Sequence, residues 1–188
     1  MVKDRLRLLL EEAGEITRLE CFDFDGTLID TPLSDVGIPM WEKATGEKFP
    51  YEGWWGQIES LDTNIFEMPV IPQVAEAYKK AKARPDTMVI MVTGRQNTPE
   101  LTSAVKGILD SKGMTFDAYR FNTGGDTGEI KRNQLNVILG ANLNINEVIL
   151  YDDREKHFED FEAWGAELLE GDFVKSFQLV RIPSTGRF

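Results

Sequence analysis

Short apolar runs alternate with helical patterns along most of the chain, and this alternation constrains the fold more than any other feature. Strand-like runs occur at residues 19–24, 87–94, 117–123, 147–153, 166–170 and 177–182. Helical patterns occur at 72–83, from Thr98 to a stop at Gly113, at 129–140 and at 154–165. Strands that alternate with helices usually build a parallel sheet that is covered on both faces. We therefore predict an α/β fold with a Rossmann-like parallel sheet and helices on both of its faces.

Residues 31–71 interrupt this alternation. The segment is rich in proline and carries the aromatic residues Trp41, Phe49, Tyr51, Trp54, Trp55 and Phe66. It is too long and too aromatic for a plain loop. Ligands of open parallel sheets bind beyond the carboxyl ends of the strands, so we predict a small cap insert over those ends. The expected organisation is one domain over residues 1–188, with 31–71 as its cap insert.

The charge and the N-terminus limit the partners and the location. The net charge is −11, whereas duplex binders need Lys and Arg for phosphate contacts, so we expect no extended duplex binding. The N-terminal pattern predicts an amphipathic helix ending near Gly14, and its apolar run is too short for a signal peptide or a membrane span. With a single cysteine, Cys21, and no targeting signal, we expect a cytoplasmic protein without a membrane partner.

Polar residues follow the predicted strands at the points where these end. They are Asp23 and Asp25 after the first strand, Thr93, Gly94 and Arg95 after the second, Lys131 beyond the third, and Asp152 and Asp153 after the fourth. In a parallel sheet all of these ends lie at one edge. The sequence therefore predicts that four carboxylates, two cationic groups and one hydroxyl meet at a single site.

Such a cluster suits phosphoryl transfer. Crowded carboxylates repel one another, and a divalent cation relieves that repulsion. A ligand set made only of oxygen favours Mg²⁺ over Zn²⁺. One aspartate can attack phosphorus and form an aspartyl-phosphate, and a second carboxyl can act as general acid and then as general base. The cationic groups and the hydroxyl would face the phosphate.

The motifs DFDGT, VTGR and YDDR, with a lysine in GGDTGEIKRNQL between the last two, resemble the haloacid dehalogenase-like (HAD) phosphohydrolase superfamily. The resemblance implies that Asp23 is the nucleophile and Asp25 the general acid/base. It implies that Thr93 donates a hydrogen bond to the phosphate and that Lys131 steadies both the nucleophile and the phosphate. A Mg²⁺ ion would be held by Asp152 and Asp153, by Asp23, and by the backbone carbonyl of Asp25.

A closer resemblance is carried by DFDGTLIDTP, by the tryptophan pair in GWWGQIESLD and by YDDREKHFEDF. These stretches look like the HAD branch of the Swiss Army Knife RNA-repair family, and VTGR and DDR are also similar to the phosphatase domain of phage polynucleotide kinases. The resemblance implies a Mg²⁺-dependent phosphohydrolase acting on a nucleotide or on the terminal phosphate of a nucleic acid. A phosphatase of a small sugar or metabolite phosphate is the first alternative. A non-catalytic interaction module on the same fold is the second.

Several of these residues allow a structural interpretation as well. Trp54 and Trp55 either stack on a base of the substrate or form the core of the insert. Arg95, with Gly94 beside it, either contacts the substrate or pairs with acidic side chains. His157 either contacts the substrate or is a partly exposed helix residue. The sequence leaves these alternatives open.

Overall fold

The computed structural model describes residues 15–183, so the helix predicted before Gly14 lies outside the described residues. Five strands form one sheet in the order β3-β2-β1-β4-β5, and every neighbouring pair is parallel. The strands are β1 (Arg18–Phe22), β2 (Thr87–Gln96), β3 (Ala118–Asn122), β4 (Glu147–Asp152) and β5 (Ser176–Arg181). The parallel sheet predicted from the alternating pattern is confirmed.

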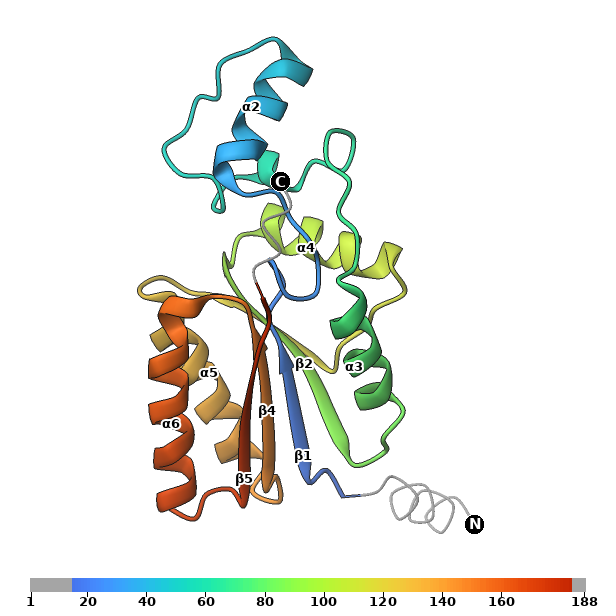
Figure 1. The fold of residues 1–188 in the computed structure, drawn as a ribbon. Helices are drawn as coiled ribbons and strands as arrows, with labels where there is room; N and C mark the ends of the chain where they lie inside the picture. Colours follow the sequence, from blue (N-terminus) through green and yellow to red (C-terminus); the bar gives the residue numbers. More distant parts are fainter. Residues whose placement is uncertain (1–14, 184–188) are drawn as a thin grey trace.

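Helices cover both faces of this sheet (Figure 1). On one face lie α3 (Pro72–Lys82) and α4 (Pro99–Ser111), and on the other lie α5 (Thr127–Ala141) and α6 (Phe158–Glu170), which follows the 3-10 turn η2 (Glu155–His157). The helix α2 (Ser34–Thr45) and the 3-10 turn η1 (Ile58–Leu61) belong to the segment between β1 and α3. Side chains alternate along β1: Leu19 and Cys21 join the core shared with α5 and α6, whereas Phe22 joins the core shared with α3 and α4. The central strands are apolar on both sides because both sides are buried.

The helix starts follow from local sequence. Thr98 caps α4, since its hydroxyl accepts a hydrogen bond from the backbone N–H of Leu101. Proline occupies the first position of both α3 and α4. One expectation is wrong: residues 166–170 are the end of α6 and not a strand. The run is short and alternates weakly, and it continues the apolar stripe that buries Phe161, Trp164 and Leu168.

The segment between β1 and α3 leaves and rejoins the sheet through a paired stem. Ile29 and Val70 form an antiparallel bridge, and the backbone N–H of Ile71 donates to the carbonyl of Leu28 at 3.0 Å. Beyond this stem the chain forms α2, a long loop and η1, which lie above the carboxyl ends of the strands in Figure 1. The buried aromatic residues of the segment are continuous with the core on the α3 and α4 face.

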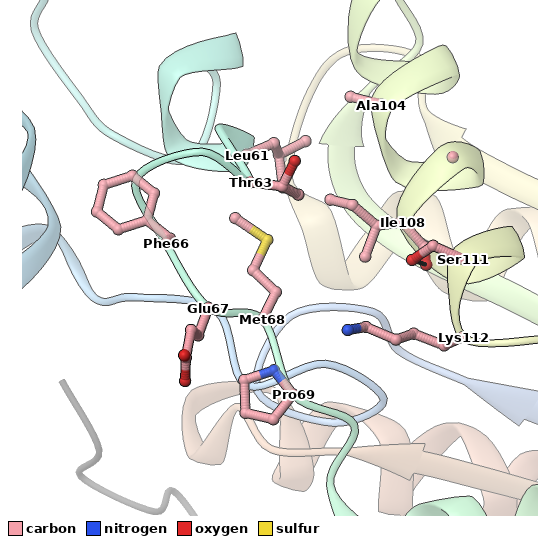
Figure 2. A pocket seen from close by; sticks show the side chains of 11 residues that line it. Leu61, Thr63, Phe66, Glu67, Met68, Pro69, Ala104, Ile108, Ser111 and Lys112 are labelled. Atoms are coloured by element: carbon pink, nitrogen blue, oxygen red, sulfur yellow. Dashed lines mark hydrogen bonds between the residues drawn. The ribbon is translucent and has the colours of Figure 1, made fainter.

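A groove of about 680 Å³ separates the returning part of this segment from α4. Figure 2 shows its wall, with Phe66 and Met68 on one side and Ile108 and Lys112 on the other. None of the polar residues predicted at the strand ends lines it. Between residues 15 and 183, no helix has both the length and the apolar character needed to cross a membrane.

Candidate active site

Strand register brings the predicted acidic residues to one level. Phe22 on β1 pairs with Met91 on β2 and with Tyr151 on β4. Asp23 directly follows β1 and Asp152 is the last residue of β4, so the two carboxylates lie close together at the edge of the sheet. The backbone N–H of Asp23 still donates to the carbonyl of Tyr151 at 3.0 Å, which fixes the height of Asp23 at the edge of the sheet.

Lys131 joins these two carboxylates. It lies in the second turn of α5 with only 2% of its surface exposed. Its Nζ atom is 2.9 Å from Oδ2 of Asp23 and 2.6 Å from Oδ2 of Asp152. Burial alone would lower the pKa of Lys131, but its contacts with the two aspartates raise that pKa above its usual value. The lysine is therefore a fixed positive charge between two strand ends.

The carboxylates outnumber this one cation. Asp23, Asp152 and Asp153 offer oxygen atoms that all lie within 4.8 Å of one another. Burial raises the pKa of Asp23 to about 8 against the lowering effect of Lys131, and the neighbouring carboxylates add to the rise. Burial and the charge of Asp152 raise the pKa of Asp153 to about 6. A divalent cation would relieve both effects, and a compact set of oxygens suits Mg²⁺, so the residues present fit that ion.

Gly26 permits the close approach of the first and fourth strand ends. It has φ +65°, and a Cβ atom at this position would lie 2.2 Å from Oδ2 of Asp153. Glycine is therefore required here for two reasons, the left-handed backbone and the missing side chain. The DFDGT motif thus shapes the acidic cluster through its glycine as well as through its aspartates.

Asp25 has surroundings that differ from those of Asp23. Its carboxylate accepts from the guanidinium of Arg95, with Nη2 to Oδ1 at 2.8 Å and Nε to Oδ2 at 2.9 Å. The hydroxyl of Thr31 donates to Oδ1 at 2.9 Å. Its side-chain carboxylate is not part of the acidic cluster. The predicted contribution of Asp25 to a metal site is therefore that of its backbone carbonyl. Thr31 was missed from the sequence, where it reads as an ordinary residue of the stem.

Thr93 and Gly94 lie near the end of β2. Thr93 is buried, and its Oγ1 accepts from the backbone N–H of Arg95 at 3.2 Å. A Cβ atom at Gly94 would lie 2.7 Å from Cγ2 of Thr127, so the glycine lets β2 approach the first turn of α5. Lys131 lies one turn further along this helix. Gly94 thereby positions the lysine relative to the sheet, and its predicted contact with the substrate stays a prediction.

The two tryptophans have different surroundings. Trp54 is 2% exposed, its Nε1 donates to the carbonyl of Pro32 at 2.7 Å, and its ring packs against Phe49 and Phe66. It forms the core of the segment, and its ring has no open face for a base. Trp55 is half-buried and lies over the guanidinium of Arg95 at 5.6 Å from ring centroid to Cζ. A substrate-binding role therefore stays a prediction for Trp55.

His157 is more deeply placed than a partly exposed helix residue. The residue is 3% exposed, and its ring lies edge-on to Phe161 and approaches the first turn of α5 at Gly128. Burial lowers its pKa. The packing of His157 brings η2, just before α6, against the first turn of α5.

The fold and this site define a class of protein. A parallel sheet with an aspartate pair after β1, a threonine near the end of β2, a buried lysine on α5 and an aspartate pair at the end of β4 is a HAD-like domain. Within that class, the chain belongs to HAD domain family 1 of Swiss Army Knife RNA repair proteins, whose family model matches residues 42–187. The match begins after β1, so the placement of Asp23 and Asp25 rests on the geometry given above.

Two solved structures share the fold. A chain in the structure of the Pnkp1/Rnl/Hen1 RNA repair complex is 16% identical, with a TM-score of 0.57 over 92% of this chain and 44% of that chain. A second structure of a Pnkp1/Rnl/Hen1 complex is 18% identical, with a TM-score of 0.57 over 93% of this chain and 48% of that chain. This chain spans about half the length of those neighbours, and at these identities the likeness establishes the fold.

Proposed function

We propose that the protein is a Mg²⁺-dependent phosphohydrolase that works through an aspartyl-phosphate on Asp23. The single observation that carries this proposal is the position of Lys131, whose Nζ lies between Asp23 and Asp152 at the edge of the sheet. A nucleophilic carboxylate needs a neighbouring cation to stay ionised when buried. Here Lys131 is that cation, and its ion pair with Asp152 keeps it in place.

In the proposed reaction, Asp23 forms and releases the covalent intermediate and Asp25 transfers the protons. The Asp23 carboxylate attacks phosphorus, and the bond between phosphorus and the leaving-group oxygen breaks. Asp25 gives its proton to that oxygen. Asp25 then takes a proton from water, whose oxygen attacks the phosphorus of the aspartyl-phosphate, so that inorganic phosphate leaves and Asp23 is restored.

The remaining residues stabilise charge. Lys131 and the hydroxyl of Thr93 are placed to offset the negative charge that develops on the phosphoryl oxygens. Mg²⁺, held by Asp23, Asp152, Asp153 and the backbone carbonyl of Asp25, would supply further charge neutralisation when bound. Residues 31–71 would act as a cap that selects the substrate and limits access of water.

The proposed substrate is a nucleotide or the terminal phosphate of a nucleic acid. The family to which the chain belongs is defined in RNA repair proteins, and two structures with the same fold come from RNA repair complexes. The net charge of −11 favours a short footprint such as a strand end, because a long footprint needs many basic contacts. A 3′-phosphatase activity of the end-healing kind fits these observations.

The test is a substrate panel with two variants. Oligonucleotides with 3′-phosphate or 5′-phosphate, mononucleotides and sugar phosphates are compared at fixed Mg²⁺ and after chelation. We expect turnover that chelation removes and that favours the nucleic-acid or nucleotide substrates. Asp23→Asn should abolish turnover while keeping the fold, and Asp35→Asn, at an exposed position in the first turn of α2, serves as the matched control. Full activity of Asp23→Asn refutes the mechanism, and a preference for sugar phosphates refutes the assigned substrate class.

A further inference from the structure

Arg95 links two parts of the molecule that are distant in sequence. Its Nε and Nη2 atoms donate to the carboxylate of Asp25, and its Nη1 donates to the carbonyl of Trp55 at 2.9 Å and to Oγ of Ser60 at 2.8 Å. Each of its three guanidinium nitrogens therefore donates to the protein. One side chain thus holds both the proposed proton carrier and the loop that leads into η1.

This arrangement is closed to solvent. The side chain of Arg95 is 1% exposed, and its guanidinium lies 5.8 Å from the ring centroid of Phe24 and 5.6 Å from that of Trp55. Hydrogen bonds of a charged pair are strengthened when water is excluded and both partners are satisfied. Arg95 is therefore not available as a direct contact for the phosphate, in contrast to the substrate-contact interpretation of VTGR.

Only one edge of the Asp25 carboxylate stays open. Oδ1 accepts from Thr31 and from Arg95, whereas Oδ2 accepts only from Nε of Arg95 among the described contacts. The side chain of Asp25 is 14% exposed, so a group above the site can reach it. The geometry favours Oδ2 as the oxygen that exchanges a proton with the leaving group.

We propose that Arg95 is a positioning residue that makes protonation of the leaving group depend on the seating of the insert. The inference rests on the proposed phosphohydrolase function. When the 55–60 segment is in place, Trp55 and Ser60 fix Nη1, and the fork of the guanidinium then fixes the direction of Oδ2 of Asp25. When the segment is displaced, Arg95 loses two acceptors and Asp25 loses its orientation.

The test separates leaving groups by their need for a proton. Benzyl phosphate has a basic alkoxide leaving group that needs general-acid help, whereas p-nitrophenyl phosphate releases a stable phenolate that needs little. The two molecules are similar in size, so binding to the insert changes little between them. The measured quantity is kcat/KM, because it covers the steps up to departure of the leaving group.

Ser60→Ala and Arg95→Lys are the informative variants. Ser60 is fully buried, and its hydroxyl meets Arg95 and the carbonyl of Gln57 rather than the reacting groups. We expect Ser60→Ala to lower kcat/KM for benzyl phosphate about tenfold and Arg95→Lys about 100-fold. For p-nitrophenyl phosphate both changes should stay within about twofold. Ser111→Ala is the control, since its hydroxyl bonds only within α4, and it should change neither value.

Thermal unfolding of each variant verifies that the fold is kept, and Ser60→Ala alone suffices where Arg95→Lys does not fold. An equal loss on both substrates, or no loss on either, overturns the positioning role while leaving the phosphatase in place. Activity that does not depend on Asp23 refutes the proposed function and the inference together. A selective loss on benzyl phosphate supports the inference.

Discussion

The contact between Gly26 and Asp153 gives the sharpest test of the acidic cluster. A Cβ at position 26 would lie 2.2 Å from Oδ2 and 2.7 Å from Cγ of Asp153, whereas ordinary contacts begin at 3.4 Å. In a Gly26→Ala variant the carboxylate therefore has to move by about 1 Å, which is enough to cost about 100-fold in rate at a reacting site. Mg²⁺ requires near-ideal octahedral geometry, so its affinity should fall as well.

A matched control separates this clash from backbone strain. Gly46, which ends α2, has φ +77°, close to the +65° of Gly26, but a Cβ atom there meets nothing within 4 Å. Alanine in the left-handed region costs about 1–2 kcal/mol in either place. Gly46→Ala should therefore show this loss of stability with normal activity and normal use of Mg²⁺.

The assay is the Mg²⁺ dependence of phosphate release, combined with urea unfolding of both variants. We expect Gly26→Ala to raise the half-saturating Mg²⁺ concentration about 10–100-fold, the range found when supports of metal ligands are disturbed. If Gly26→Ala and Gly46→Ala lose the same stability and keep the same Mg²⁺ dependence, Asp153 is not a metal ligand.

Three further predictions concern buried side chains. Lys131→Met leaves two buried carboxylates without their cation and should lower the free energy of unfolding by about 3–5 kcal/mol, measured by urea denaturation with chelator; a loss below about 1 kcal/mol would contradict the ion pairing. Trp54→Ala should lower the free energy of unfolding by about 3–5 kcal/mol because it removes a buried ring, whereas Trp55→Ala should lower it clearly less. Equal losses of the two variants in urea unfolding would show that the two rings are packed alike. The pKa of His157 is lowered in the folded state. As the pH falls below about 6.5, the unfolded chain therefore binds a proton before the folded one does. Below that pH the free energy of unfolding should fall by at most about 1.4 kcal/mol per pH unit. His157→Gln should lack this component, and parallel pH profiles of unfolding for the two proteins would refute it.

The sequence predicts the strand ends well because a parallel sheet leaves little freedom there. Strands buried on both faces are recognisable as apolar runs, and parallel pairing places their carboxyl ends at one edge. This is why Asp23, Lys131 and Asp152 could be expected to meet, as their contacts confirm. The same reasoning fails for residues 166–170, since a short apolar run fits the stripe of a helix as well as a strand.

Two of the partners of Arg95 could not be predicted because they come from the insert. Nothing in the local sequence marks Ser60 or the carbonyl of Trp55 as acceptors, and both reach the site only after the chain has passed through α2 and a long loop. The difference between Trp54 and Trp55 has the same origin. Adjacent residues point in different directions, and only the packing of the insert determines which ring is enclosed.

The two aspartates of DFDGT differ in the cation that each one meets. Asp23 meets Lys131, a compact ammonium that it shares with Asp152, whereas Asp25 meets the planar fork of Arg95. An ammonium can follow a carboxylate that attacks phosphorus, because its three hydrogens rotate freely about a flexible stem. A guanidinium fork instead fixes the plane of the carboxylate, which suits a group that must present one oxygen to a leaving group and then to water. The pairing with different cations thus supports the division into a nucleophile and a proton carrier independently of the order of the motif.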